Sequence, residues 1–192
     1  MSGNGGDYLL FCEHEPVITM GKSGKRANLL VSDADLQRRG IAYYEIERGG
    51  DLTYHGPGQL VGYPIFKLGR LREVQGFVRK MEESLIRALA EFGIRGERRP
   101  DHAGVFVGGA KIASIGAAVQ GGVTFHGFAL DVCTDLDYFR VINPCGMPGV
   151  GLTTIAEQCG REVTLTETKP YVRRAMADVF DWKLIDEERI AS

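Results

Sequence analysis

The stretch VFVGGAKIASIGAAVQGGVTFHGFALDV, residues 105–132, carries the strongest signal for the fold of this chain. Its β-rich runs alternate with glycine pairs in the order Val105–Val107, Gly108-Gly109, Lys111–Val119, Gly121-Gly122 and Val123–Val132. Two glycines in a row between such runs are typical of tight hairpin turns, because both central residues of the turn need positive φ. The stretch therefore predicts three strands joined by two hairpins.

Further strands are expected before this stretch, where short β-rich runs are bounded by turn residues. The segment Arg48–Gly58 contains four glycines and a proline, so it is expected to be a long loop. The four strands predicted around it are Tyr8–His14, Val17–Met20, Ile41–Glu47 and Gln59–Leu68.

Helical patterns occur on both sides of the hairpins. Apolar residues recur at helical spacing over Val74–Phe92, and Gly93 follows at the position of a C′ glycine. Ser32 and Asp35 form a capping-box pattern, which predicts a short helix over Asp33–Arg39. Two more patterns predict a helical turn over Thr134–Arg140 and a C-terminal helix around Val172–Phe180.

These elements follow one another without a regular βαβ order. They predict the α+β class, with a central mixed or mostly antiparallel sheet flanked by helices. The chain has 192 residues, 44% of them hydrophobic and 25% charged, which suits a single domain over residues 1–192 with a buried core. The first seven residues, MSGNGGD, are polar and glycine-rich, so we expect them to be disordered and not a signal peptide.

Charge and hydropathy exclude two classes of partner. A net charge of −2 gives no overall positive field to attract nucleic acid or an anionic membrane. The uncharged stretch Ile112–Leu130 contains four glycines and several polar side chains, so it predicts a β-hairpin and not a membrane span. Basic residues do gather between Lys67 and Lys80, and both a solvated helix face and a docking patch for an acidic protein remain open.

The four cysteines lie at unrelated spacings, so we expect free thiols and a cytoplasmic protein. Cys12 and Cys133 lie in or beside apolar strands, where a small buried side chain is expected. Cys145 instead lies between a proline and a glycine on a loop, where a thiol is better placed to react. The histidines do not show the spacing of metal ligands, and we expect no metal.

Two features allow both a structural and a functional interpretation. Lys111 begins an otherwise uncharged strand, either as a strand-end charge that reaches water or as a partly desolvated functional amine. A nearby cation favours the reactive thiolate of a cysteine, and Lys111 is a candidate for that cation. The segment Arg48–Gln59, RGGDLTYHGPGQ, matches no common phosphate-binding motif, and both a ligand-binding loop and a structural loop remain open.

Several motifs together resemble those of the lipoyl(octanoyl) transferases, which are relatives of lipoate-protein ligases and biotin protein ligases. The match covers roughly Leu9 to Ile155 in the order and spacing of that family, and it implies a biotin/lipoate protein ligase-like fold. Phe106 departs from the family, which commonly has Trp there. The matching motifs are RGGDLTYHGPGQLVGYPI from Arg48, GVFVGGAKIASIG from Gly104, VTFHGFALDV from Val123 and NPCGMPGVGLTTI from Asn143.

The resemblance also implies the roles of individual residues. Cys145 matches the nucleophile that forms an acyl-thioester, and Lys111 matches the residue that activates it. His55 is then expected to position the substrate, whereas His126 is expected to be a structural residue of its strand. Substrate contacts are implied for Arg48, Gly49, Gly50, Asp51, Leu52, Thr53, Tyr54 and His55, for Ser114, Ile115 and Gly116, and for Gly127, Phe128 and Ala129.

The activity implied by the resemblance is transfer of an octanoyl group from octanoyl-acyl carrier protein to the acceptor lysine of lipoyl domains. Such domains occur in 2-oxoacid dehydrogenase subunits and in the glycine-cleavage H protein. This early step of protein lipoylation needs no cofactor beyond the phosphopantetheine that carries the acyl group. Two alternatives remain, an ATP-dependent lipoate or biotin-type ligase and a catalytically inactive relative that binds lipoyl domains or carrier protein. We expect a monomer.

Overall fold

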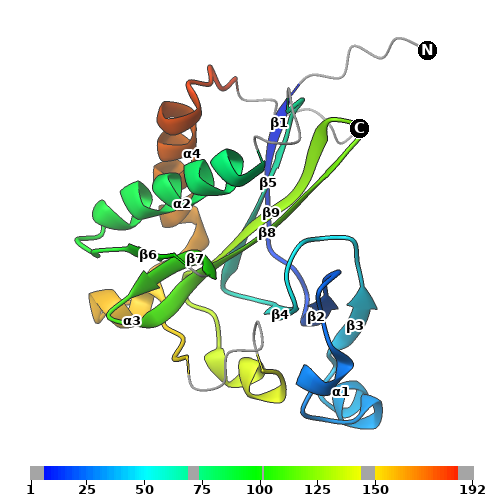
Figure 1. Ribbon diagram of the computed structural model, residues 1–192. Coiled ribbons are helices and arrows are strands. Elements are labelled where there is room, and N and C mark those ends of the chain that lie inside the picture. Colours follow the sequence, from blue (N-terminus) through cyan, green and yellow to red (C-terminus); the bar gives the residue numbers. More distant parts are fainter. Residues whose placement is uncertain (1–6, 69–73, 101, 144–149, 186–192) are drawn as a thin grey trace, which may run out of the picture.

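The computed structural model describes residues 7–68, 74–100, 102–143 and 150–185, whose strands form two sheets. The larger sheet has six strands in the order β1-β5-β9-β8-β7-β6 (Figure 1). Neighbouring strands in this sheet are antiparallel throughout. Their bounds are β1 (Tyr8–Cys12), β5 (Gln59–Ile65), β6 (Glu97–Arg99), β7 (His102–Val107), β8 (Ala110–Gln120) and β9 (Val123–Asp131).

The two predicted hairpins join β7 to β8 and β8 to β9. All four turn glycines have positive φ, which explains why glycine occupies both positions of each turn. β8 and β9 pair over eight residues, from Ala113 opposite Leu130 to Gln120 opposite Val123. This long hairpin is the centre of the larger sheet, and the prediction of three strands joined by two hairpins is confirmed.

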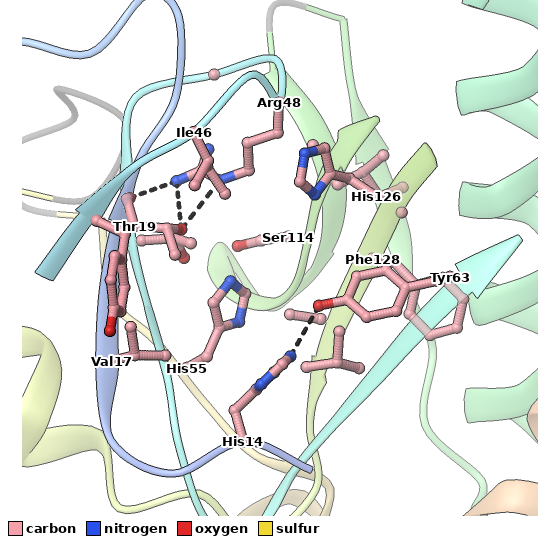
Figure 2. Close-up of a pocket in the computed structure, with 18 of the residues that line it drawn as sticks. His14, Val17, Thr19, Ile46, Arg48, His55, Tyr63, Ser114, His126 and Phe128 are labelled. Atoms are coloured by element: carbon pink, nitrogen blue, oxygen red, sulfur yellow. Dashed lines mark hydrogen bonds between the residues drawn. The ribbon is translucent and has the colours of Figure 1, made fainter. Parts of the chain in front are cut away.

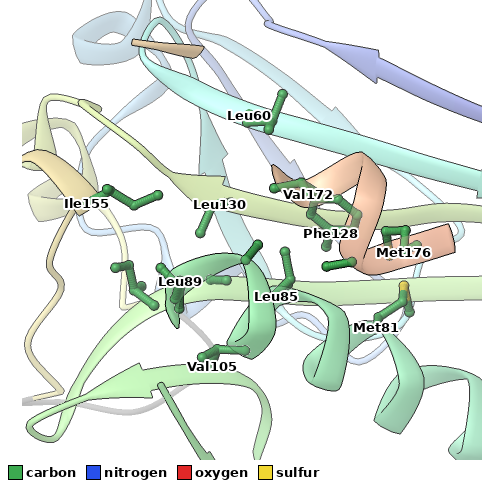
Figure 3. Close-up of a cluster of buried hydrophobic side chains, with 14 of the residues drawn as sticks. Leu60, Met81, Leu85, Leu89, Val105, Phe128, Leu130, Ile155, Val172 and Met176 are labelled. Carbon is green, nitrogen blue, oxygen red and sulfur yellow. The ribbon is translucent and has the colours of Figure 1, made fainter. Parts of the chain in front are cut away.

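Two long helices, α2 (Val74–Ala90) and α4 (Leu165–Phe180), cover one face of the larger sheet (Figure 1). Both were predicted from apolar spacing, and Gly93 has the positive φ of a C′ glycine after α2. Their apolar faces close the main core against the sheet (Figure 3). Its buried side chains include Leu60, Met81, Leu85, Leu89, Val105, Phe128, Leu130, Ile155, Val172 and Met176.

The smaller sheet has three strands in the order β3-β2-β4, with bounds β3 (Ala42–Glu45), β2 (Val17–Met20) and β4 (Leu52–His55). β2 is parallel to β3 and antiparallel to β4. The helix α1 (Asp33–Arg38) and the 3₁₀ helices η1 (Arg26–Asn28) and η3 (Leu136–Val141) lie in the same part of the molecule (Figure 1). The second core formed there contains Ile18, Leu36, Ile41, Leu52, Tyr54, Phe139, Val141 and Ile142.

Most predicted elements are confirmed, including the capping box of Ser32 and Asp35 at the start of α1. The prediction of a loop throughout Arg48–Gly58 is wrong, because this segment contains β4. Leu52 and Tyr54 are fully buried in the second core, and their burial gives the segment a strand conformation despite its glycines. The strand β6 and the helix α3 (Ile155–Cys159), which Thr154 and Glu157 cap, were not predicted.

The α+β class with a mixed or mostly antiparallel sheet arrangement is confirmed. Residues 1–7 were expected to be disordered. Residues 1–6 lie outside the described ranges, so this expectation stays a prediction for them. Among the described helices, each is too short or too polar to cross a lipid bilayer. The uncharged stretch Ile112–Leu130 lies in β8 and β9, as predicted.

The basic residues between Lys67 and Arg99 are in part neutralised by acids of α2. Arg79 and Arg98 both form ion pairs with Glu82, at 2.8 Å and 3.3 Å, although Glu82 is fully buried. Arg98 also pairs with Glu83. These contacts give two of the basic side chains a structural role, while a docking role for the remaining ones stays a hypothesis.

Candidate active site

A cavity of about 570 Å³ lies between the two sheets (Figure 2). Its walls come from the β1–β2 connection, β2, the segment around Arg48, β4, β5, and the middle of β8 and β9. The volume is within the range of about 300–1,000 Å³ found for small-molecule sites. Most of the surface of the lining is apolar, with contributions from Val17, Ile46, Val61, Ile115, Phe128 and Ala129.

Eleven of the fourteen residues expected to contact substrate line this cavity, together with Lys111. Leu52 and Tyr54 are instead buried in the second core, beneath the loop that carries the others. The carboxylate of Asp51 accepts hydrogen bonds from the Lys25 N–H and from the Asn28 side chain. The lining residues are Arg48, Gly49, Gly50, Thr53, His55, Ser114, Ile115, Gly116, Gly127, Phe128 and Ala129.

Arg48 is largely buried and is bound to the protein itself. Its guanidinium donates to the Thr19 hydroxyl at 3.0 and 3.1 Å and to the Thr19 carbonyl at 2.6 Å. The next residue, Gly49, donates its N–H to the carbonyl of Ala117 on β8 at 3.2 Å. Arg48 therefore holds the glycine segment on the smaller sheet while Gly49 attaches it to the larger one.

The glycines in this wall allow backbone segments to approach closely. A Cβ atom on Gly116 would lie 3.0 Å from the Gly49 carbonyl oxygen, and one on Gly127 would lie 2.1 Å from the Gly62 carbonyl oxygen. Such distances are shorter than van der Waals contact, so a side chain at Gly127 would push β5 away from β9. Gly116 and Gly127 thus determine how closely the neighbouring backbone segments approach, and with this the width of the cavity.

Lys111 lies near the start of β8 and is only 3% exposed. Its ammonium is 5.8 Å from the centre of the Phe106 ring, and its Cε packs against Gly104, where a Cβ would lie 2.8 Å away. Lys111 lines the main cavity and also a second cavity of about 410 Å³ on the side of Ser23 and His102. The amine is therefore a buried group that two cavities reach, and not a strand-end charge in water.

The segment that follows Cys145 runs beside Lys111. The backbone N–H of Lys111 donates to Gly151 at 2.8 Å, and the N–H of Thr153 donates to the Lys111 carbonyl at 3.0 Å. Cys145 itself lies outside the described residues, as do its neighbours from 144 to 149. The pairing of Cys145 with Lys111 therefore stays a prediction.

Three histidines also line the main cavity (Figure 2). Burial lowers the pKa of His55 to about 4, so this ring is neutral at physiological pH. Burial and the charge of Arg48 also lower the pKa of His126, a strand residue with a positive φ of 58°. The Nε2 atom of His14 lies 2.7 Å from the Tyr63 hydroxyl. Tyr63 lies within the matching motif that begins at Arg48, but no substrate contact was expected of it, and His14 lies outside the quoted motifs.

A buried polar pair lies behind His55. The Nε2 atom of Gln59 donates to the Asp131 carboxylate at 2.8 Å, and both side chains are almost fully buried. Burial raises the pKa of Asp131 to about 7, against the opposing influence of Gln59 and of the Lys111 charge. Both residues lie in the quoted motifs, but sequence reasoning missed their pairing because they are 72 residues apart in the chain.

The other candidate residues lie apart from these features. Cys133 is exposed, contrary to expectation, and lies two residues beyond the end of β9. Cys12 is half-buried, and its Sγ lies 3.5 Å from the Nε2 atom of His14. Within the described ranges, no group of three or more His, Cys, Asp or Glu side chains has the arrangement of a metal site.

Comparison with known proteins agrees with this architecture. Residues 1–177 match the family model described as "Lipoyl protein ligase A/B catalytic domain". A protein of Myxococcus xanthus named "Octanoyltransferase" is 44% identical over 191 residues, which cover 96% of this chain and 54% of that protein. Another protein of this name, from Solibacter usitatus, is 44% identical over 191 residues, with 99% of this chain and 86% of that protein covered.

A solved structure supports the fold at lower sequence identity. The crystal structure of lipoate-protein ligase A bound with ATP has a TM-score of 0.82 and 18% identity, over 96% of this chain and 76% of that chain. The expected biotin/lipoate protein ligase-like fold is therefore confirmed. The chain spans about half the length of the Myxococcus relative, so a relative of this type contains additional sequence.

Proposed function

Because this chain belongs to the lipoyl protein ligase A/B catalytic domain family, we propose that it is an octanoyltransferase. The acyl donor is octanoyl-acyl carrier protein, and the acceptor is a lysine of a lipoyl domain. Similarity to proteins named octanoyltransferase, at 44% identity over almost the whole chain, supports this activity over the other activities of the family.

The observation that best supports the proposal is an apolar cavity with a buried lysine in its wall. A volume of about 570 Å³ accommodates an eight-carbon chain. Each CH₂ group that leaves water contributes about 0.8 kcal/mol, so the cavity favours an aliphatic acyl group. Ile115 and Phe128 offer the apolar contact, and Lys111 is available for chemistry at the polar end.

In the first step, the thiolate of Cys145 attacks the thioester carbon of the octanoyl donor. A bond from sulfur to the acyl carbon forms, and the bond to the pantetheine sulfur breaks. Lys111 as an ammonium gives its proton to the departing thiolate, which leaves as a thiol. One thioester replaces another, so this step needs no ATP.

In the second step, the ε-amine of the acceptor lysine attacks the acyl-enzyme. Lys111, now a neutral amine, takes a proton from the attacking nitrogen, and Cys145 leaves as a thiolate. Formation of the amide drives the transfer, because an amide is more stable than a thioester. The enzyme returns to its starting protonation state.

Mass spectrometry of the full chain mixed with octanoyl-acyl carrier protein tests this mechanism. We expect one octanoyl group on Cys145, which is lost when a lipoyl domain is added. Cys145→Ala should form no adduct and no product, while Cys133→Ala, which removes an exposed thiol, should behave like the wild type. Unchanged turnover in Cys145→Ala would refute the thioester mechanism.

An ATP-dependent ligase is the second candidate, because lipoate-protein ligase A has the same fold. A ligase would activate free octanoate with ATP and would need no thiol nucleophile. Incubation with octanoate, ATP and a lipoyl domain should give no octanoyl-lysine if the first proposal is correct. A chain that binds lipoyl domains but transfers no acyl group from either donor would be an inactive relative.

A further inference from the structure

The amide of Gln59 can have only one orientation in its site. Its nitrogen donates to the carbonyl of Tyr54 at 3.3 Å and to the carboxylate of Asp131 at 2.8 Å. A backbone carbonyl only accepts hydrogen bonds, so the amide nitrogen must be the atom that faces Tyr54. The amide oxygen of Gln59 then faces the other way, toward His55.

This orientation determines the tautomer of His55. The Nδ1 atom of His55 lies 2.7 Å from the Oε1 atom of Gln59, which can only accept. Nδ1 therefore carries the ring proton. In a neutral imidazole the other nitrogen, Nε2, then has a free lone pair and no proton.

The surroundings of His55 keep the ring neutral. Burial is the main cause that lowers its pKa to about 4, and the positive charge of Arg48 and the nearby rings of His14 and His126 act in the same direction. The centre of the His14 ring lies 5.7 Å from that of His55. Both rings lie in the wall of the main cavity (Figure 2).

We propose that Gln59 and Asp131 are positioning residues that hold His55 as its Nδ1–H tautomer, so that Nε2 accepts a hydrogen bond from a ligand in the cavity. Asp131 orients the amide of Gln59, and Gln59 orients the ring. His55 is thereby a hydrogen-bond acceptor in a cavity whose lining is largely apolar. Its position depends on two buried side chains, Gln59 and Asp131, that motif reasoning does not connect to it.

An acceptor in the cavity requires a ligand with an N–H or O–H group. The hydrocarbon part of an octanoyl group has neither, so the contact is to a polar part of a substrate, and the donor offers one. The pantetheine arm of an acyl carrier protein has amide N–H groups near its sulfur. This identification of the ligand rests on the proposed function, whereas the tautomer of His55 does not.

NMR of the full chain with ¹⁵N-labelled histidine tests the tautomer independently of activity. Long-range correlations between ring protons and ring nitrogens should show Nδ1 protonated and Nε2 unprotonated in His55 from pH 8 to pH 5. Gln59→Leu removes the acceptor of Nδ1–H, and the signals should shift toward the Nε2–H tautomer. The matched control is Gln37→Leu, which changes an exposed glutamine of α1 and should leave the spectrum of His55 unchanged.

A protonated Nε2 in the wild type, or an unchanged His55 tautomer in Gln59→Leu, would overturn the proposal. A folded state of Gln59→Leu is verified by the other histidine signals in the same spectrum. If Gln59→Leu unfolds, Asp131→Asn provides the second variant, because Asn keeps an oxygen that accepts from Gln59 and should preserve the tautomer. Loss of the tautomer in folded Asp131→Asn would also contradict the proposed chain.

Kinetics with two small donors tests the contact to ligand. Octanoyl-N-acetylcysteamine has an amide N–H near its sulfur, and octanoyl propanethiol ester has none. One neutral hydrogen bond corresponds to a factor of about 10 in binding, so Gln59→Leu should raise KM about 10-fold for the first donor only. In a His55→Ala background, Gln59→Leu should have no further effect on KM.

Equal effects of Gln59→Leu on both donors, or additive effects of the two substitutions, would exclude His55 as the acceptor for the donor amide. If the wild type transfers octanoyl from neither donor nor from carrier protein, the proposed function fails. The NMR test of the His55 tautomer does not depend on activity, so its result is independent of that outcome.

Discussion

The residue Gly104 shows how a missing side chain can create space for a reactive one. Its backbone has φ of +136°, and a Cβ there would lie 2.8 Å from the Lys111 Cε and 2.5 Å from the Ala113 carbonyl oxygen. Gly104 also donates its N–H to the buried carboxylate of Glu82 at 3.1 Å. The position of the Lys111 amine therefore depends on a residue that has no functional group.

Gly104→Ala should reduce both stability and activity. The added methyl group must displace the Lys111 side chain or the backbone of β8, and the positive φ adds strain of about 1–3 kcal/mol. A displacement of about 1 Å at a reacting group lowers activity about 100-fold, so kcat/KM for octanoyl transfer should fall by that order.

Gly40→Ala is the matched control for Gly104→Ala, because Gly40 has φ of +67° and no atom within 4 Å of its would-be Cβ. Because of this strain, Gly40→Ala should lower the free energy of unfolding in urea. Its kcat/KM for octanoyl transfer should be unchanged. Equal activity of the two variants would mean that Gly104 does not position Lys111.

Asp131 and His55 give the stability opposite dependences on pH. The pKa of Asp131 is raised to about 7 in the folded state, from an ordinary value of 3.8. Between pH 7 and pH 3.8 the folded state therefore holds a proton on Asp131 that the unfolded state has lost. This contribution stabilises the fold as pH falls, by about 1.4 kcal/mol per pH unit. The pKa of His55 is lowered to about 4, so its contribution is lost as pH falls below 6.5.

Asp131→Asn should therefore raise the free energy of unfolding at pH 8 relative to the wild type, because a buried carboxylate charge is removed. Between pH 6.5 and pH 5 the variant should lose stability faster than the wild type, since the contribution of His55 remains and the opposing contribution of Asp131 is gone. Urea unfolding at pH 8, 6.5 and 5 measures both effects. Asp137→Asn, at a side chain 71% exposed, is the control, and the same pH profile for Asp131→Asn and wild type would refute the assignment.

At the scale of elements, α2 does more than cover the sheet. Its residue Glu82 is fully buried and accepts hydrogen bonds from Gly104 on β7 and from Arg79 on its own helix. Arg98 on β6 completes the ion pair at 3.3 Å. One carboxylate thus joins α2 to the edge strand β6 and to its neighbour β7 in the larger sheet.

Glu82→Gln should destabilise the fold by about 2 kcal/mol, because it leaves two guanidinium groups without their buried partner. Glu83→Gln, on the next residue, changes an ion-paired carboxylate that is 33% exposed and should cost at most about 1 kcal/mol. Urea unfolding of both variants measures the difference. A smaller loss for Glu82→Gln than for Glu83→Gln would show that the buried pair is not a net stabilising contact.

At the scale of the whole molecule, the candidate site exists because two sheets with separate cores lie next to each other. The larger sheet contributes Lys111 and the apolar wall, and the smaller sheet contributes the segment around Arg48 and His55 (Figure 2). One direct backbone link between them is the bond from the Gly49 N–H to the Ala117 carbonyl. Arg48 keeps that link in place through its bonds to Thr19.

Arg48→Met should weaken the contact between the sheets more than it weakens either sheet. It keeps much of the apolar length of the side chain but removes three hydrogen bonds to Thr19, at a cost of about 2–3 kcal/mol. Hydrogen exchange of the Gly49 amide should become faster while the amides of β8 and β9 stay protected. Arg39→Met, at an exposed position, is the control. Unchanged exchange at Gly49 in Arg48→Met would contradict this role.

The elements that could be predicted are those whose conformation depends on nearby residues. The glycine pairs of the hairpins need positive φ, the capping box of Ser32 and Asp35 closes over three residues, and the apolar spacing of α2 follows one helix face. The family motifs pointed to Lys111 in the same way. These signals are local, so the sequence alone contains them.

Other features required the tertiary structure, because their partners lie far apart in the chain. β4 is a strand since Leu52 and Tyr54 enter a core completed by η3, and no local pattern specifies that core. Gln59 and Asp131 are 72 residues apart, and only the pairing of β5 with β9 buries them together. The sequence by itself determined most of the elements and the family of this protein. The shape of the cavity, the burial of Lys111 and the tautomer of His55 were decided by packing, which depends on contacts between distant segments.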